Sequence, residues 1–274
     1  MSAVSATVPA DAGSARRFSG LQRLFGTSGA AAIRAAHAVV VGVGGVGSWA
    51  AETLARSGVA RLTLIDLDHV AESNINRQVQ ALESTVGQAK VLAMRERIAQ
   101  INPECRVLPI DEFVEPGNWL DLLTQARQSL GEVDAVIDCC DQPRAKLIMA
   151  AWARTSQALF ITAGAAGGKR LAHRVEIDDL AHVTHDPLLA QLRQRLRKEY
   201  HAPREGRRIG ITCAFSRESV AAPDPSCLLE RESQSVSDGT LNCHGYGSMV
   251  AVTATFGQCA AGWIIDQLAM RARL

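Results

Sequence analysis

Three charged side chains that could bind a triphosphate follow apolar segments between residues 61 and 141 of this 274-residue chain. Arg77 and Lys90 could neutralise phosphates and the charge that develops on a leaving pyrophosphate. Asp141 could hold Mg²⁺, which binds through one or two carboxylates together with phosphate oxygens. Each charge alone would be ordinary on a solvated surface. The three residues together favour ATP as the ligand, because a nicotinamide enzyme has no use for two cations and an extra aspartate at the ends of its strands.

A glycine loop precedes these charges. The loop Gly42-Val43-Gly44-Gly45-Val46-Gly47 follows the β-branched run 38–41 and opens a segment with helical spacing. Glycines let the backbone approach phosphates, and a helix N-terminus presents N–H groups and positive potential to them. Asp66 comes nineteen residues after Gly47, where a carboxylate can accept both ribose hydroxyls. Taken alone, the loop fits a dinucleotide as well as ATP.

Alternating strands and helices would bring these residues to one edge of a sheet. Short apolar runs predict strands over 38–41, 61–65, 106–110, 133–138, 159–163, 174–177 and 209–215. Helical spacing predicts helices over 45–57, 86–102, 119–130, 141–156 and 187–200. This alternation predicts an α/β fold with a doubly wound, mostly parallel Rossmann-like sheet and additional C-terminal strands and helix. Such sheets bind ligands at the carboxyl ends of their strands.

We expect a single domain over residues 17–270, with a nucleotide-binding half of about 35–165 and a substrate-binding half of about 166–270. Residues 1–16 match no targeting signal and are expected to form a disordered tail. The polar stretch 221–242 is expected to be a long mobile loop. The uncharged segment 245–265 contains Ser, Thr, Gln and many Ala residues, so a buried helix is favoured over a membrane span.

The composition excludes several classes of protein. The chain has 29 Lys and Arg residues against 28 Asp and Glu, and 47% of its residues are hydrophobic, so it is neither a disordered acidic chain nor a polybasic one. Its seven cysteines include no CxxC pair, which argues against a four-cysteine zinc site and against a disulfide framework. This cysteine usage fits a reducing compartment, and we expect a cytoplasmic location.

The motifs GVGGVG, DLD, NINRQ and DCCDQ, together with Lys90, resemble the ubiquitin-activating-enzyme-like superfamily over roughly residues 17–270. Members of that superfamily adenylate a carboxylate with Mg-ATP, and the resemblance implies a homodimer. It also implies that the loop glycines contact ATP, that Asp66 holds the ribose and that Asp141 binds magnesium. The remaining nucleotide contacts that it implies are Asp68, Asn74, Arg77, Lys90 and an arginine donated across the dimer, for which we choose Arg23.

Within the superfamily, the segments GVGSWAAETLARSG, RIAQINPECRV, DPLLAQLRQRLRKEY and MVAVTATFG are similar to the branch that acts on the threonylcarbamoyl group of adenosine 37 in tRNA. That similarity implies an ATP-dependent cyclising dehydration through an acyl adenylate of the threonine carboxylate. The alternative is an adenylyltransferase that activates the C-terminus of a small sulfur-carrier or ubiquitin-like protein. The absence of CxxC pairs counts against it, because those relatives hold zinc with two such pairs.

Modified tRNA is therefore an expected partner of a chain whose net charge is only +1. The stretch 193–208 contains seven Lys and Arg residues against two Glu, and RNA contact there is about as well supported as a solvated helix face. A cysteine-desulfurase sulfur-acceptor system is a further partner that relatives suggest. Dehydration needs no cysteine nucleophile, so we assign Cys243 a loop or packing role.

Overall fold

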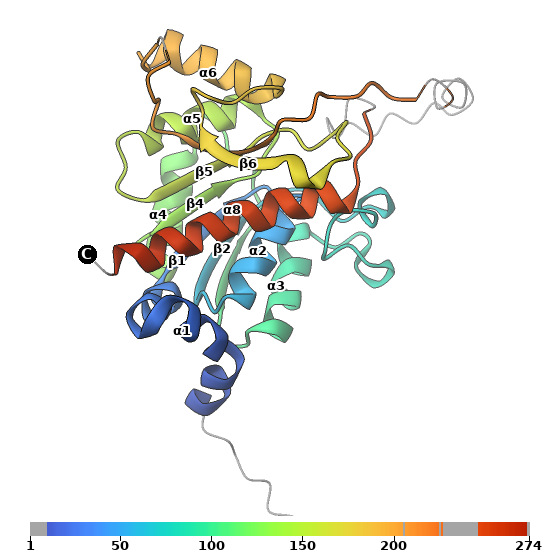
Figure 1. Ribbon diagram of the computed structural model, residues 1–274. Coiled ribbons are helices and arrows are strands. Elements are labelled where there is room, and N and C mark those ends of the chain that lie inside the picture. The colour runs from blue at the N-terminus through green and yellow to red at the C-terminus, as the bar shows by residue number, and fades with distance from the viewer. Residues whose placement is uncertain (1–9, 205, 225, 227–245, 273–274) are drawn as a thin grey trace, which may run out of the picture.

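A seven-stranded sheet organises the protein (Figure 1). The computed structural model describes residues 10–204, 206–224, 226 and 246–272. The strands lie in the order β3-β2-β1-β4-β5-β7-β6, and all neighbours are parallel except the edge pair β6 and β7. They are β1 (His37–Val41), β2 (Arg61–Ile65), β3 (Arg106–Ile110), β4 (Ala135–Asp138), β5 (Leu159–Ala163), β6 (Val175–Asp179) and β7 (Thr212–Ser216). The predicted doubly wound α/β fold is confirmed.

Helices cover both faces of this sheet, as the alternation of strands and helices requires (Figure 1). One face carries α1 (Ala10–Ala35), α2 (Gly47–Arg56), α3 (Lys90–Ile101) and α8 (Val250–Arg271). The other face carries α4 (Trp119–Leu130), α5 (Pro143–Ala153) and α6 (Pro187–Glu199). Successive residues of β1 alternate between the two apolar cores, Ala38 and Val40 in one and Val39 and Val41 in the other. Short 3-10 turns lie at Glu72–Asn74, Glu83–Thr85 and Ala172–Arg174.

The N-terminal helix corrects the sequence prediction. Helix α1 begins at Ala10, so residues 10–16 are helical and not part of a disordered tail; residues 1–9 lie outside the described part of the chain. Alanine has the highest helix propensity, and this segment is rich in it. The helix bends at Gly26, whose φ of 76° no ordinary helix contains. Because of this interruption, the residues of α1 do not follow one continuous helical period, and the sequence pattern did not predict the helix.

Several predicted elements differ from the structure at their ends. Helix α3 starts at Lys90 and not at residue 86, because Gly87 adopts a left-handed φ of 87°. The uncharged segment 245–265 contributes most of α8, much of which is buried against α2 and the sheet. In the described part of the chain, no helix is long and apolar enough to cross a membrane. The predicted loop 221–242 falls almost entirely outside the described residues.

His37 lies buried at the amino end of the sheet, where it begins β1. The His37 side chain is fully buried; its Nδ1 lies 2.9 Å from the carbonyl oxygen of Gly131 and its Nε2 lies 2.9 Å from Thr63 Oγ1. Burial lowers the pKa of His37 below its usual 6.5. The folded state therefore favours the neutral ring, and its contribution to stability is present above about pH 6.5 and is lost as the pH falls toward the lowered pKa.

We expect His37→Gln to be less stable than the wild type by about 1–3 kcal/mol near pH 7.5, since it disturbs two buried hydrogen bonds. The difference should shrink as the pH falls to about 5, because only the wild type loses the histidine contribution. Urea unfolding of both proteins across this range measures it. A difference that stays constant with pH would contradict the titration of His37.

Candidate nucleotide-binding site

The candidate site lies at the carboxyl ends of β1, β2 and β4. These strands are parallel, with Val41 in register with Ile65 on one side and with Asp138 on the other. The chain therefore leaves the three strands side by side, and the residues that follow them converge. Gly42, Asp66 and Cys139 are the first of these residues. The glycine loop, the carboxylates and the DCCDQ segment thus meet at one edge, as the sequence predicted.

Gly42 and Gly47 make the turn between β1 and α2 possible. Gly42 has a φ of 82°, and a Cβ on it would lie 2.9 Å from the backbone nitrogen of Cys140. A Cβ on Gly47 would overlap the carbonyl oxygen of Gly42. Gly44 is open, since a Cβ there would meet only the side chain of Gln78, at 4.0 Å. The first and last glycines are therefore required by packing, and the middle of the loop faces space that a ligand can use.

Asp66 holds the glycine loop in place. Its Oδ2 accepts a hydrogen bond from the Val43 N–H at 2.6 Å, and its Oδ1 accepts one from the Asp68 N–H at 2.9 Å. Burial raises the pKa of Asp66, although the Lys90 ammonium acts in the opposite direction. The sequence assigned this carboxylate to a ribose. Its contacts show that it also ties the loop to the end of β2.

Lys90 reaches the same edge from the first residue of α3. Its Nζ lies 2.7 Å from Asp68 Oδ2, and its backbone N–H donates to the Asp68 carbonyl oxygen at 2.9 Å. Only 3% of the Lys90 side chain is exposed, whereas 32% of the Asp68 side chain is. A buried ammonium held by a single carboxylate keeps two N–H donors for other acceptors, so it can contact a phosphate.

The NINRQ segment also lies beside the loop. Asn74 Oδ1 accepts a hydrogen bond from the Ala71 N–H at 3.1 Å, so this side chain shapes a local turn. Arg77 passes beside the loop, because a Cβ on Gly45 would lie 3.3 Å from Arg77 Cγ. Its Nη1 donates to the Ser73 carbonyl oxygen at 2.5 Å and to Asn76 Oδ1 at 2.9 Å. The half-buried guanidinium retains other N–H groups for a ligand.

Gln78 is a candidate ligand contact that the sequence analysis did not select. Its side chain is 2% exposed, and its Nε2 has no hydrogen-bond partner among the described residues. That nitrogen is the nearest side-chain atom to the open position at Gly44. Buried amide groups are seldom left without an acceptor, so this one can donate to a ligand in the loop. Its place in the NINRQ motif, next to Arg77, was the available signal.

Asp141 follows a buried ion pair that anchors the end of β4. Lys146 and Asp138 are both fully buried, with Lys146 Nζ 3.0 Å from Asp138 Oδ2. Lys146 also donates to Thr162 Oγ1 and to the Ala163 carbonyl oxygen, at 2.9 and 2.8 Å. These bonds join the ends of β4 and β5 to α5. Asp141 follows this anchor with its side chain exposed, so its carboxylate is free to bind a cation in solvent.

Cys139 and Cys140, which follow Asp138, pack against the two apolar cores. Burial raises the pKa of Cys139 to about 12 and that of Cys140 well above its usual value, and thiols in this state are poor nucleophiles. Cys140 Sγ lies 3.1 Å from Asp138 Oδ1. These contacts give both cysteines a packing role beside the nucleotide site. Cys243 lies outside the described residues.

Arg23 does not belong to this cluster within one chain. It lies with an exposed side chain on α1, whose residue Phe18 packs against Gly58 just before the amino end of β2. Later in the same helix, Gly29 lies against Ala269 of α8. These contacts place α1 toward the edge opposite the glycine loop (Figure 1). Among the described residues, no group of three or more His, Cys, Asp or Glu side chains could hold a metal by itself.

Known proteins share both the sequence and the fold. The model of the ThiF family matches residues 18–269. The chain is 39% identical to a tRNA threonylcarbamoyladenosine dehydratase of Haemophilus influenzae, over 92% of this chain and 93% of the relative. It is 38% identical to the Escherichia coli protein of the same name, over 94% and 95% of the two chains. A crystal structure of that E. coli protein in complex with ATP superimposes with a TM-score of 0.81 at 38% identity, covering 94% of this chain and 96% of the other. The chain belongs to the ThiF family.

Proposed function

We propose that this protein is an ATP-dependent dehydratase that cyclises the threonylcarbamoyl group of a modified adenosine in tRNA. One observation carries the proposal. The glycine loop, Asp66, Lys90 and Asp141 converge on one sheet edge, in a chain that matches tRNA threonylcarbamoyladenosine dehydratases over more than nine tenths of both lengths. This arrangement suits the binding of a triphosphate and the activation of a carboxylate beside it.

The first step is adenylation. The threonine carboxylate of the substrate attacks the α-phosphorus of ATP, a P–O bond forms, and pyrophosphate leaves with the electron pair of the bond that breaks. Lys90 and Arg77 stabilise the charge that grows on the leaving group. The loop N–H groups after Gly42 and the Gln78 amide hold the phosphates, and Asp66 holds the loop and the ribose. These side chains orient the reactants and need not bond covalently to either.

Mg²⁺ fits this edge of the sheet. Asp141 offers an exposed oxygen ligand and no cysteine or histidine ligand accompanies it in a described cluster, which suits a hard cation. Mg²⁺ usually keeps several waters and needs only one or two protein carboxylates when phosphates supply the rest. Asp141 would hold the ion. When bound, Mg²⁺ would neutralise phosphate charge.

The second step is intramolecular. The carbamoyl nitrogen of the same substituent attacks the activated carbonyl carbon, a C–N bond forms, the C–O bond to AMP breaks, and the nitrogen loses a proton. Holding both groups in one substituent provides the nucleophile at a high effective concentration. No protein nucleophile is required, which agrees with the raised pKa values of Cys139 and Cys140. The net change in the tRNA is the loss of one water.

Incubation with Mg-ATP and either modified tRNA or a small carrier protein tests this function. We expect AMP formation only with the tRNA, together with a nucleoside lighter by one water. AMP formation with the carrier protein, and a carrier adenylate in the mass spectrum, would instead support the alternative adenylyltransferase. Neither product with either substrate would overturn both assignments.

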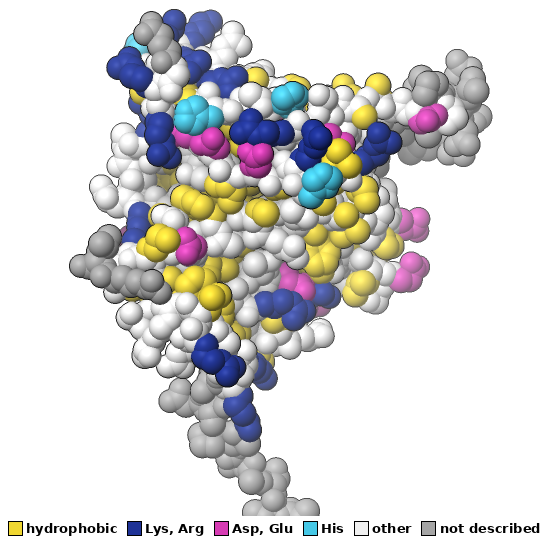
Figure 2. Space-filling model, viewed as in Figure 1, with side chains coloured by type: hydrophobic (Ala, Val, Ile, Leu, Met, Phe, Trp, Pro, Cys, Tyr) yellow, Lys and Arg dark blue, Asp and Glu magenta, His cyan; other side chains and the backbone are white. Residues whose placement is uncertain are grey.

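The basic stretch 193–208 supplies the proposed tRNA contact. Its side chains fall into two groups, those that bond the protein itself and those that are exposed. Some of them support the fold: Arg193 Nη1 donates to the carbonyl oxygens of Leu180 and Val183 at 3.0 and 2.8 Å, and Arg195 pairs with Glu199 at 2.8 Å. Others are exposed, namely Lys198, Arg204, Arg207 and Arg208. Lys and Arg side chains gather over α6 and the segment after it (Figure 2).

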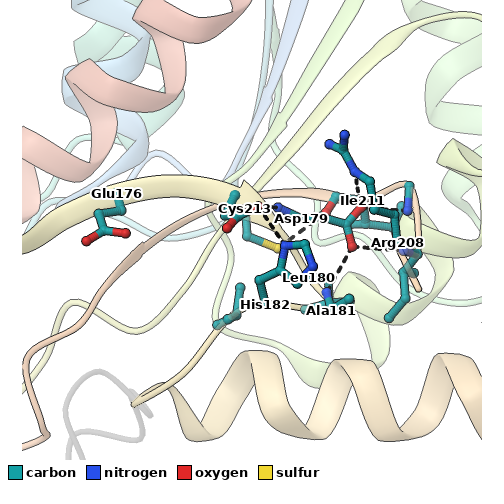
Figure 3. A network of polar contacts seen from close by, with 12 residues as sticks. Glu176, Asp179, Leu180, Ala181, His182, Arg208, Ile211 and Cys213 are labelled. Carbon is teal, nitrogen blue, oxygen red and sulfur yellow. Dashed lines mark hydrogen bonds and ion pairs between the residues drawn. The ribbon is translucent and has the colours of Figure 1, made fainter. Parts of the chain in front are cut away.

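Asp179 fixes the position of this basic segment. Its carboxylate accepts hydrogen bonds from the N–H groups of Ala181, Ile209 and Gly210 at 2.9, 2.8 and 2.7 Å. Arg208 lies 3.9 Å from it (Figure 3). The chain after α6 is therefore tied to the end of β6. A fixed row of exposed cations can hold a phosphate backbone in one register.

We expect Glu substitutions at Lys198, Arg204 and Arg207 to weaken tRNA binding at least about tenfold at moderate salt and to flatten its salt dependence, because fewer counterions are released. ATP affinity should not change. The matched control replaces Arg95, Arg106 and Arg127 with Glu, an equal change of charge near the β3 edge of the sheet. Equal tRNA affinities for the two triple variants would leave the basic stretch as a solvated face.

We also propose a homodimer in which Arg23 reaches the nucleotide site of the second copy, since α1 lies away from the site of its own chain. Arg23→Ala and Asp141→Ala should each be inactive alone. Mixed dimers should regain up to about a quarter of wild-type activity, because half of the dimers contain one complete site. No recovery after subunit exchange argues against the shared site. Contact with a cysteine-desulfurase sulfur-acceptor system stays a proposal without a described surface.

A further inference from the structure

A pocket of about 280 Å³ lies outside the cluster around the glycine loop. One wall is the segment from Val183 to Ala190, which leads into α6, and the other is Ser219 and Val220, which follow β7. Lys169 joins the two walls. Its Nζ donates to the carbonyl oxygen of His185 at 3.2 Å and to those of Ser216 and Glu218 at 3.3 and 2.7 Å. The pocket is therefore braced from behind by a buried cation and does not depend on a loose loop.

The pocket is tied to the carboxyl end of β5. Asp186, which lines the pocket, caps α6 through Leu189 N–H and accepts a second hydrogen bond from the Ala165 N–H at 2.9 Å. Ala165 follows β5, which is the strand next to β4. Neighbouring strands are about 4.8 Å apart. The pocket therefore lies at the carboxyl end of β5, the strand beside the one that precedes Asp141.

The lining is suited to a flat heteroaromatic ring. Pro187 and Val220 provide apolar surface, and the hydroxyl group of Ser219 can bond the edge of a base. Thr184 Oγ1 lies 2.9 Å from His185 Nδ1 and so helps to position that ring. Arg193, whose guanidinium supports the carbonyl groups of Leu180 and Val183, lies at the pocket where the basic stretch begins. His185 has a left-handed φ of 58°, which is uncommon for a residue other than glycine and presents its exposed ring at the pocket. Histidine is a planar group on which unstacked RNA bases pack.

We propose that this pocket receives a single unstacked base of the tRNA anticodon loop, a neighbour of the modified adenosine. The inference rests on the proposed function and adds to it the means by which the loop is placed. Proteins that read RNA in loops splay bases apart and hold them by stacking and by hydrogen bonds to their edges. A base in the pocket, phosphates on the basic stretch and the modified side chain at Asp141 would form three attachment points for one RNA loop.

Filling the pocket tests the proposal. Ala190→Phe places a ring in the space from helix α6, and Gln191→Phe is the matched control, because Gln191 is exposed on the same helix and does not line the pocket. His185→Asn is a second variant that removes the ring with a residue that tolerates the left-handed backbone. Thermal unfolding and ATP affinity show that each variant is folded. The RNA probe is an anticodon stem-loop carrying the modified adenosine, in an intact form and in a series with one abasic nucleotide at each loop position.

We expect Ala190→Phe and His185→Asn to weaken binding of the intact stem-loop at least about fivefold, with Gln191→Phe unchanged. One abasic position should weaken wild-type binding by a similar factor and add little to the loss in the two variants. Unchanged affinity in both variants, or losses that multiply at every position, overturns the base pocket. Wild-type conversion of the intact stem-loop to the cyclic product is measured alongside. If it occurs while the pocket variants bind normally, only this inference fails; if it does not occur, the proposed function fails and this inference with it.

Discussion

Gly47→Ala will abolish ATP binding and lower the stability of the fold. A Cβ at this position overlaps the carbonyl oxygen of Gly42 and lies 3.2 Å from the Cβ of Cys139, so either the loop or the start of α2 must move. Both neighbours are anchored: the Gly42 N–H donates to the Ile65 carbonyl oxygen at 2.8 Å, and Cys139 follows the buried Asp138. We expect a loss of about 3 kcal/mol in urea unfolding. Calorimetric titration with Mg-ATP should show no binding.

Gly44→Ala separates the two roles of the loop glycines. A Cβ at Gly44 meets only Gln78 Nε2, at 4.0 Å, so the folded state can accept it without a shift of the backbone. We expect wild-type stability to within about 0.5 kcal/mol. Its ATP affinity should fall if the phosphates use the open space in the loop. Retention of normal ATP affinity by Gly47→Ala would show that the overlap is relieved by a movement that the nucleotide tolerates.

The strands and the loop were predictable because their sequence signals are local. A parallel strand inside a sheet is a mostly apolar run, and the runs 61–65 and 159–163 coincide with the inner strands β2 and β5. The run 106–110 coincides with the edge strand β3. The residues that end such strands meet at one edge by topology alone. For this reason the sequence alone predicted that Asp66 and Asp141 lie at the same edge of the sheet as the glycine loop.

The side-chain pairings could not be predicted in the same way, because they join residues that no local period relates. Nothing in the sequence distinguishes Lys146 from a surface charge on a helix. In the structure it is fully buried and bonded to Asp138 and Thr162. Arg193 was counted among the RNA-binding cations, yet it supports the backbone at Leu180 and Val183. The sequence shows how many charged residues a segment contains. Which of them can contact a partner depends on their exposure, which only the structure shows.

Asp141→Ala will abolish ATP-dependent cyclisation, with an expected loss of at least about a thousandfold in turnover. The side chain is exposed, so its removal leaves no cavity, and stability should change by less than about 0.5 kcal/mol. The effect is therefore separable from folding. Nucleotide binding measured with EDTA present should match the wild type, because the loop, Asp66 and Lys90 are intact. The dependence of ATP affinity on Mg²⁺ should disappear.

The matched control for Asp141 is Asp111→Ala. Asp111 is also exposed, and it also comes just after a parallel strand, β3, at the same edge of the sheet. The two substitutions remove the same charge from the same edge and differ mainly in the strand that presents it. If magnesium is held beside β4, only Asp141→Ala stops cyclisation. Comparable losses in both variants would mean that turnover depends on the negative potential of the whole edge, and near-normal turnover of Asp141→Ala would remove this carboxylate from the reaction.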